Sequence, residues 1–216
     1  MIDRSTGHAI AIMYPGEIFD VRFDGTNYIV TGPDGNPLAA AGPIRFLPTS
    51  PDNLFLIESI LRTNILGGPA LKPTYRGAIE VARGASTTAG RVNLVNILEL
   101  ENYVKGVVAN ESPASFHTEA LKSQATAARG YAIANIRNWI RRGYTFDLVD
   151  SSSSQVYRCV LSEHPNAVAA TEGTRGLVAS FNGRIISALY SSSFGVIVTA
   201  LTGFSTRQVP SFQART

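Results

Sequence analysis

Residues 98–136 read "LELENYVKGVVANESPASFHTEALKSQATAARGYAIANI", a stretch in which two helical patterns meet near a proline. In the first pattern, apolar side chains recur on one helical face: Leu100, Tyr103, Val104, Val107 and Val108. Pro113 must end this helix, because proline cannot donate to a continuing helix and disfavours the helical conformation of the residue before it. Glu111 is therefore expected in the last turn of the first helix or just beyond it.

The position of Glu111 is unusual for a carboxylate. A carboxylate at a helix C-terminus meets the negative end of the helix macrodipole, which disfavours its charged form. A carboxylic acid that keeps its proton is what general acid catalysis needs. The plainer alternative is a solvated residue at a helix end. Glu99, Glu101 and Glu119 stand near helix starts, where capping and dipole roles account for them.

The second pattern predicts a helix from about Thr118 to Arg141. Its apolar positions recur at intervals of three and four residues: Leu121, Ala125, Ala128, Ala132, Ile136 and Trp139. Arg129 falls among these alanines, and an unpaired buried charge is very costly. Two interpretations remain open. Arg129 either forms a structural ion pair with a buried carboxylate or faces a polar cleft shared with Glu111.

The rest of the chain predicts strands and turns. Asp24-Gly25 and Asp34-Gly35 are turn signals between β-favouring runs, and residues 54–62 fit either a strand or a short helix. Asn182-Gly183 lies between two apolar runs and predicts a hairpin with a type I′ turn. We therefore expect an α+β fold with a β-rich N-terminal part, two central helices around a kink and a C-terminal β-hairpin region.

Polar side chains gather at two further places. The returning strand of the hairpin ends at Ser191–Ser193, where loops on a rigid scaffold often carry function. We assign ligand contacts there to Tyr190, Ser192 and Ser193, although the serines are equally consistent with a strand end. Ser151–Ser154, followed by Gln155, predict a loop, and such serine runs are most often solvated turns.

The quoted stretch resembles the SpoIID/LytB family, named after the stage II sporulation protein D. Members share a "GVV" segment, a glutamate near a proline and an "EALKxQAxAARxYA" block. Segments on both sides fit as well: "YRGAIEV" (75–81), "SSSSQVY" (151–157), "ATEGTRGLV" (170–178) and "ISALYSSSFG" (186–195). The resemblance covers roughly residues 70–195 and implies one SpoIID-like domain over 1–216, with 1–70 as a possible β-rich subdomain.

The resemblance implies action on peptidoglycan. The sporulation protein is a lytic transglycosylase that cleaves glycan strands lacking stem peptides, and its essential carboxylate falls on Glu111. A lytic transglycosylase needs only one carboxylate, because the sugar's own 6-hydroxyl attacks the anomeric carbon, whereas ordinary glycosidases need two. The family pattern favours the cleft position for Arg129, and it makes the loop with Ser153, Ser154 and Gln155 face the substrate.

In sporulation members that loop carries cysteine and histidine ligands of zinc. This chain has serines there, and hydroxyls are poor zinc ligands, so we expect no metal and no other cofactor. Cys159 has no partner cysteine and is expected to be a buried apolar thiol. The three histidines form no ligand motif and are expected to be surface or satisfied side chains: His8, His117 and His164.

A second function remains open, namely a non-catalytic wall-binding or amidase-enhancing module with a cell-wall amidase as partner. Beyond Ser193 the sequence departs from the family, and the tail from Ala200 to Thr216 lacks the closing segment of members. That departure favours the second function, whereas the presence of both Glu111 and Arg129 favours the first. The sequence does not fix the oligomeric state.

Composition sets further bounds. A hydrophobic fraction of 44% and a charged fraction of 16% indicate a globular protein. The net charge of +3 comes without a lysine/arginine block beyond Arg141 and Arg142, so nucleic acid is not an expected partner, whereas an anionic cell wall is. A wall-active protein must be exported. The start "MIDRSTGHAIAIMYP" is not a secretory signal, and we expect an extracytoplasmic location with the export signal outside this sequence.

Overall fold

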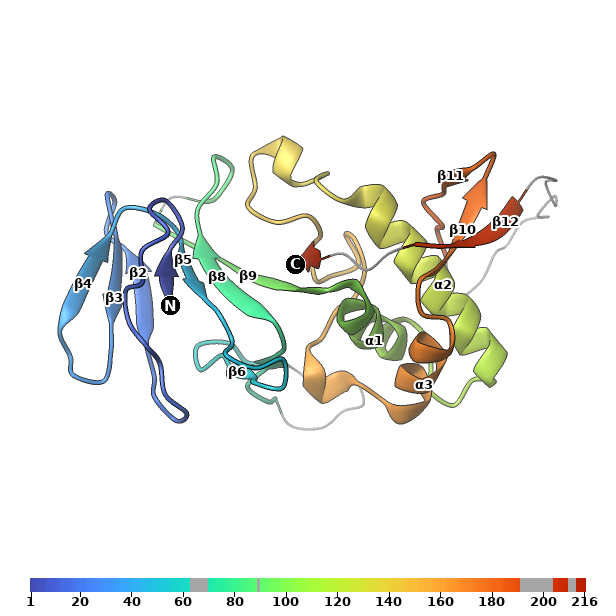
Figure 1. Ribbon diagram of the computed structural model, residues 1–216, viewed down its shortest axis with the longest axis horizontal. Helices are drawn as coiled ribbons and strands as arrows, with labels where there is room; N and C mark the ends of the chain where they lie inside the picture. Colours follow the sequence, from blue (N-terminus) through green and yellow to red (C-terminus); the bar gives the residue numbers. More distant parts are fainter. Residues whose placement is uncertain (63–69, 89, 191–203, 210–212) are drawn as a thin grey trace.

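The computed structural model describes residues 1–62, 70–88, 90–190, 204–209 and 213–216. Figure 1 shows an elongated molecule, with β-sheets at the N-terminal end and helices with a smaller sheet at the other end. The described residues form three α-helices, two short 3-10 helices and four small sheets, all of whose paired strands are antiparallel. The expected α+β class is confirmed.

The N-terminal end begins with a three-stranded meander. Its strands are β2 (Asp20–Phe23), β3 (Tyr28–Thr31) and β4 (Pro37–Ala40). Both expected Asp-Gly turns are present, with positive φ angles of 112° at Gly25 and 73° at Gly35. Asp24 fixes the first turn because its Oδ1 accepts the backbone N–H groups of Thr26 and Asn27, each at 2.8 Å.

The central sheet joins strands from distant parts of the chain. Its order is β1 (Ile2–Asp3), β5 (Ile44–Phe46), β8 (Ala78–Ala82), β9 (Asn93–Glu99) and β13 (Gln213–Arg215). Strands on both sides of residue 70 therefore share one sheet. In the 54–62 region, the strand alternative is confirmed, because β6 (Phe55–Leu56) pairs with β7 (Thr74–Tyr75).

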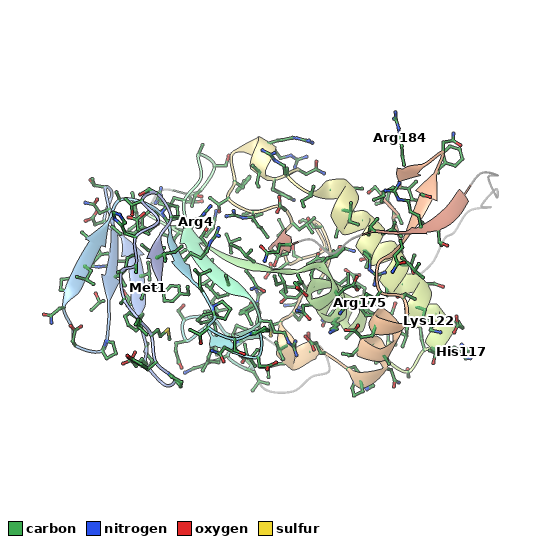
Figure 2. All side chains as sticks on the ribbon, in the orientation of Figure 1. Met1, Arg4, His117, Lys122, Arg175 and Arg184 are labelled. Carbon is green, nitrogen blue, oxygen red and sulfur yellow. The ribbon has the colours of Figure 1, made fainter. Side chains whose placement is uncertain are left out.

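A buried carboxylate holds this sheet together. Glu80 of β8 is only 3% exposed and accepts Arg45 Nη2 at 2.6 Å and Arg4 Nε at 3.1 Å, and it also pairs with Arg215 of β13. Arg4, labelled in Figure 2, lies on the side of β5 and β8. The tail thus contributes an edge strand to the central sheet, and β12 (Phe204–Gln208) pairs with β10 (Leu177–Phe181). The expected departure just after Ser193 falls outside the described residues.

The two central helices are confirmed. Helix α1 (Leu100–Glu111) follows β9 directly and buries the predicted apolar face, and Glu111 is its last residue. Helix α2 (Thr118–Asn135) begins after a six-residue connection. His117 Nδ1 accepts the N–H of Glu119 at 3.3 Å and so caps α2. His164 caps α3 (Pro165–Gly173) in the same way, so both histidines are satisfied as expected.

The expected extension of α2 to Arg141 is wrong. The helix ends at Asn135, because Ile136 is extended and Arg137 adopts a left-handed conformation with φ 65°. Asp147 Oδ1 accepts the N–H of Arg137 at 2.8 Å and stabilises this turn. Trp139, which fitted the helical spacing, instead packs edge-on against Tyr144, with ring centroids 5.4 Å apart. Tertiary contacts therefore override the local pattern. A 3-10 helix, η1 (Ile140–Arg142), follows.

The C-terminal hairpin is confirmed, but its returning strand ends at Ile185, and the expected extension toward Ser191 is wrong for the described residues 186–190. After η2 (Val160–Ser162) and α3, strand β10 (Leu177–Phe181) pairs with β11 (Arg184–Ile185). Asn182 and Gly183 both have positive φ angles, 47° and 75°, as a type I′ turn requires.

We predict that Gly183→Ala lowers the free energy of unfolding by about 1 kcal/mol, because a Cβ strains a left-handed residue. Open space surrounds the position where that Cβ would lie, so the cost is conformational and not steric. Chemical denaturation would measure it. The control Asn182→Gly keeps the turn and should change stability by only a few tenths of a kcal/mol, about the conformational cost of a glycine. Equal midpoints for Gly183→Ala and the parent protein would contradict the assignment of the turn.

Candidate functional site

The site is built at the C-terminal end of α1. The half-buried carboxylate of Glu111 receives a backbone hydrogen bond, because Val156 N–H donates to its Oε1 at 2.6 Å. Val156 lies 45 residues further along the chain, in the segment that follows the serine loop. One oxygen of the carboxylate, Oε1, is thus fixed as a hydrogen-bond acceptor by the backbone.

A chain of hydrogen bonds leads to the same carboxylate. Tyr103 on α1 donates its hydroxyl to Gln155 Oε1 at 3.1 Å, and Gln155 Nε2 donates to the hydroxyl oxygen of Tyr190 at 2.9 Å. Tyr190 in turn hydrogen-bonds the side chain of Glu111. Gln155 Nε2 also lies 3.3 Å from the carbonyl oxygen of Ala128 on α2. The amide of Gln155 is fully buried, so its orientation is set by these partners.

Burial controls the protonation of both tyrosines. Burial raises the pKa of Tyr190, and the negative charge of Glu111 raises it further, while the hydrogen bond from Gln155 opposes the shift. Burial is also the main cause of the raised pKa of Tyr103. Both phenols therefore stay neutral near pH 7 and act as hydrogen-bond donors. Tyr190 directs its proton at the carboxylate where reaction chemistry would take place.

Close packing fixes the segment that carries Gln155 and Val156. The ring of Tyr157 lies on α1 at Gly106, where an added Cβ would come within 2.6 Å of the ring. Tyr157 also packs against Tyr103, with centroids 5.3 Å apart, and donates its hydroxyl to Asn96 Oδ1 on β9 at 2.9 Å. A glycine at 106 is therefore needed for this segment to approach Glu111.

Arg129 does not face a cleft, and that expectation is wrong. Its side chain is 0% exposed and forms a two-pronged pair with Glu101, with Nε to Oε1 at 3.0 Å and Nη2 to Oε2 at 2.8 Å. Arg129 Nη1 donates to the carbonyl oxygen of Leu177 at 2.7 Å. Glu101 accordingly is a partner in a buried ion pair and not only a dipole residue. The physical reason is the cost of leaving either charge unpaired in the core.

The other expected contact residues have different placements. Ser154 Oγ accepts Trp139 Nε1–H at 3.2 Å and Val149 N–H at 3.1 Å, so its hydroxyl shapes the loop. Ser153 is exposed, and its N–H points to Ser151 Oγ at 3.4 Å. The structure thus brings Gln155 and Tyr190 to Glu111 but not Ser153 and Ser154, whose role in substrate binding stays a prediction. Ser192 and Ser193 lie outside the described residues.

Sequence reasoning missed two groups of the site. Tyr103 fitted the apolar face of α1. Its hydroxyl was the available signal, because a buried tyrosine hydroxyl needs a hydrogen-bond partner. The N–H of Val156 is a backbone group that no side-chain motif reveals. Tyr131 is close enough that its charge would raise the pKa of both Tyr103 and Tyr190, although burial remains the main cause of both shifts.

The described residues contain no group of three His, Cys, Asp or Glu side chains that could hold a metal ion. The expected absence of zinc stays a prediction. Cys159 is buried, 2% exposed, as expected for an apolar thiol. In the part of the chain that the structure describes, no helix has the length and apolarity needed to cross a membrane.

The placement of Arg129 predicts its energetic role. Arg129→Ala should lower the free energy of unfolding by roughly 3–5 kcal/mol, because it leaves Glu101 buried without a partner. Glu101→Gln should also destabilise strongly, whereas replacing both residues together, as Arg129→Met with Glu101→Leu, should cost much less than the sum of the single changes. Thermal or chemical unfolding of the four proteins would measure the coupling, and additive effects would contradict it.

Part of the chain is similar to known proteins. The family model for stage II sporulation protein matches residues 88–181, which include both central helices and Glu111. The amidase enhancer of Bacillus subtilis (strain 168) is 40% identical over 107 residues, which are 50% of this chain and 14% of that protein. Stage II sporulation protein D of Bacillus amyloliquefaciens is 32% identical over 134 residues, covering 54% of this chain and 38% of the relative.

An uncharacterised protein of Brachyspira hyodysenteriae is 34% identical over 102 residues, 47% of this chain and 27% of its own length. The chain thus spans between 14% and 38% of the length of these curated relatives. The matched region carries the α1–α2 pair, the serine loop and the first strand of the hairpin. Residues 88–181 are thus similar to the stage II sporulation protein (SpoIID) family, and the relatives named stage II sporulation protein D and amidase enhancer agree with that resemblance.

Proposed function

We propose that this protein is a lytic transglycosylase that cleaves peptidoglycan glycan strands outside the cytoplasmic membrane, with Glu111 as its acid and base. The observation that supports this most is the polar setting of Glu111. Val156 N–H holds Oε1, while Tyr190 and Gln155 form a donor chain that ends at the same carboxylate. A carboxyl group oriented in this way can exchange one proton with a bound sugar.

The reaction has two proton transfers. Protonated Glu111 gives its proton to the glycosidic oxygen between N-acetylmuramic acid and N-acetylglucosamine, and the bond from that oxygen to the anomeric carbon breaks. The 6-hydroxyl of the muramic acid then attacks the anomeric carbon, and the Glu111 carboxylate accepts the hydroxyl proton. The product is a 1,6-anhydro sugar, no water is consumed, and the carboxyl group ends protonated as it began. The hydrogen bond from Tyr190 stabilises the carboxylate between the two transfers.

A mechanism with a single carboxylate fits the surroundings of Glu111. Other acidic groups on the neighbouring helices are paired with cations. Glu101 pairs with Arg129, Glu172 with Lys105 at 2.6 Å, and Glu119 with Lys122 at 2.8 Å. None of these pairs involves Glu111. Hydrolysis by the usual two-carboxylate route needs a second free carboxyl at a defined separation, whereas internal attack by a sugar hydroxyl needs none.

A second candidate function is a non-catalytic module that enhances a cell-wall amidase. It is favoured by the relative at 40% identity, which is itself named an amidase enhancer. In that case the surface around Glu111 would hold glycan without cleaving it, and an amidase would be the partner. The two functions differ in one observable, the appearance of 1,6-anhydro ends.

We predict that the protein releases 1,6-anhydro products from purified glycan strands stripped of peptides, and that Glu111→Gln abolishes this release. The amide keeps the size of the side chain and its acceptor for Val156 N–H but cannot donate the acid proton. Mass analysis of the products measures the activity. Glu99→Gln, an exposed change next to the start of α1, is the matched control and should cleave at the parent rate. Parent-like cleavage by Glu111→Gln would refute the assigned role, and no cleavage by the parent would favour the amidase-enhancing function.

We also predict that Tyr190→Phe lowers the cleavage rate by roughly tenfold, about the worth of one hydrogen bond to a charged group. The phenol donor stabilises the Glu111 carboxylate between the two proton transfers, so its loss should lower kcat with little change in KM or in thermal stability. Steady-state cleavage of stripped glycan strands, beside a thermal melt, measures both. A parent-like kcat would show that Tyr190 does not act on Glu111.

A further inference from the structure

Five arginines gather on two loops that lie apart from Glu111 in the chain. We call them the arginine patch: Arg83, Arg91, Arg137, Arg141 and Arg142. The first two flank the connection between β8 and β9, and the others lie in the turn after α2. Figure 1 shows the two segments, teal and yellow, along the same edge of the molecule.

Hydrogen bonds hold the two loops together. Ser86 donates its backbone N–H to the carbonyl oxygen of Gly143 at 3.1 Å and its hydroxyl to that of Arg142 at 2.6 Å. Within the first loop, Arg83 Nη1 donates to the carbonyl oxygen of Arg91 at 2.8 Å. The arginine patch is thus one surface built from two fixed loops.

The patch has almost no opposing charge. The sequence contains no Asp or Glu between residues 81 and 98 or between 120 and 146. The nearest carboxylates along the sequence, Glu80 before Arg83 and Asp147 after Arg142, are both buried. Glu80 pairs with arginines outside the patch, and Asp147 accepts the backbone N–H of Arg137. Among the described residues, no carboxylate forms an ion pair with any of the five arginines. Elsewhere arginines are paired, for example Arg45 and Arg215 with Glu80.

Two members are held by aromatic rings instead. The guanidinium of Arg142 lies 5.1 Å from the ring centroid of Trp139, and that of Arg83 lies 4.7 Å from the ring centroid of Phe23. Stacking leaves the N–H edges of a guanidinium free to donate. Arg91, Arg137, Arg141 and Arg142 are exposed. The surface therefore offers oriented donors and uncompensated positive charge.

We propose that the arginine patch binds an anionic polymer of repeating phosphodiester groups, of the polyol-phosphate kind that cell walls carry. The patch contains arginine and no lysine, and the planar guanidinium fork matches two oxygens of a phosphate. Several uncompensated cations on one fixed surface suit a chain with repeated charges better than a single small anion. The choice of a wall polymer rests on the proposed wall function.

The test measures binding of poly(glycerol phosphate) over a range of salt concentrations. Arg137→Gln, Arg141→Gln and Arg142→Gln, combined in one variant, should weaken binding at least tenfold and reduce the salt slope by about two to three, since each lost phosphate contact removes somewhat less than one released counterion. The matched control removes three cations elsewhere, Lys122→Gln, Arg175→Gln and Arg184→Gln, which Figure 2 labels at the helical end. The control should change affinity less than twofold.

Two further variants keep the test decisive. Arg91→Gln, an exposed change in the other loop, should reduce the salt slope by about one without affecting the turn after α2. Lysine at positions 137, 141 and 142 keeps the charge but loses the fork, so binding should fall between the parent and the glutamine variant. Parent-like binding by the lysine variant would overturn the proposed phosphate recognition, and equal losses in patch and control variants would overturn the site.

Competing polymers identify the partner class. Poly(glutamate) should bind more weakly than poly(glycerol phosphate) at equal charge, and equal binding would show that charge alone is recognised. Tighter binding of duplex DNA would overturn the wall-polymer assignment. The glutamine variant of the patch should still cleave stripped glycan strands at the parent rate. If the proposed cleavage function is wrong, the parent protein itself does not cleave the glycan strands. If only the polymer-binding proposal is wrong, the parent protein cleaves the strands, and the patch and control variants bind the polymer equally.

Discussion

The buried pair between Arg129 and Glu101 is the constraint on which the helical half of the molecule depends. Arg129 reaches elements that are distant in the sequence: Glu101 on α1, the Thr171 carbonyl on α3 at 3.4 Å and the Leu177 carbonyl on β10 at 2.7 Å. Glu101 Oε1 accepts the N–H of Gly176 at 3.1 Å as well. Two charges buried together are tolerable only when every polar atom has a partner, so the pair forces these elements into one arrangement.

That arrangement positions the candidate site. Glu101 and Glu111 stand near opposite ends of α1, so the helix that the ion pair fixes is also the one that ends in Glu111. The carbonyl of Ala128, the residue before Arg129, lies 3.3 Å from the amide of Gln155 and helps to orient the donor chain toward Tyr190. The buried pair therefore helps to fix the Glu111 carboxyl group in two ways. It fixes α1, which ends in Glu111, and it fixes the part of α2 whose Ala128 carbonyl orients Gln155.

Features set by neighbouring residues could be predicted from the sequence, whereas features set by tertiary contacts could not. The Pro113 break, the Asp-Gly turns and the Asn182-Gly183 turn depend on neighbouring residues, and the structure has all of them. Arg129 was misplaced because its partner is 28 residues away and Glu101 fitted a dipole role. The end of α2 was predicted too late because Asp147, ten residues beyond Arg137, and the ring of Tyr144 hold the chain in a turn. In the site, Glu111 stood out at its helix end and the family resemblance pointed to Gln155, although Gln155 is fully buried and bonds Tyr190 instead of facing solvent. The backbone N–H of Val156 left no side-chain signal.

Trp139 connects the arginine patch with the candidate site. Its ring supports Arg142 on one side, while its indole N–H donates to Ser154 Oγ, one residue before Gln155. The loop that carries Gln155 and Val156 is therefore held at one end by Tyr157, which packs on α1, and at the other by Trp139, which stacks against Arg142. Because a fixed loop keeps its donors aimed at Glu111, the packing of Trp139 serves both surfaces. A polymer held at the patch would thus contact the same rigid unit that orients the Glu111 carboxylate.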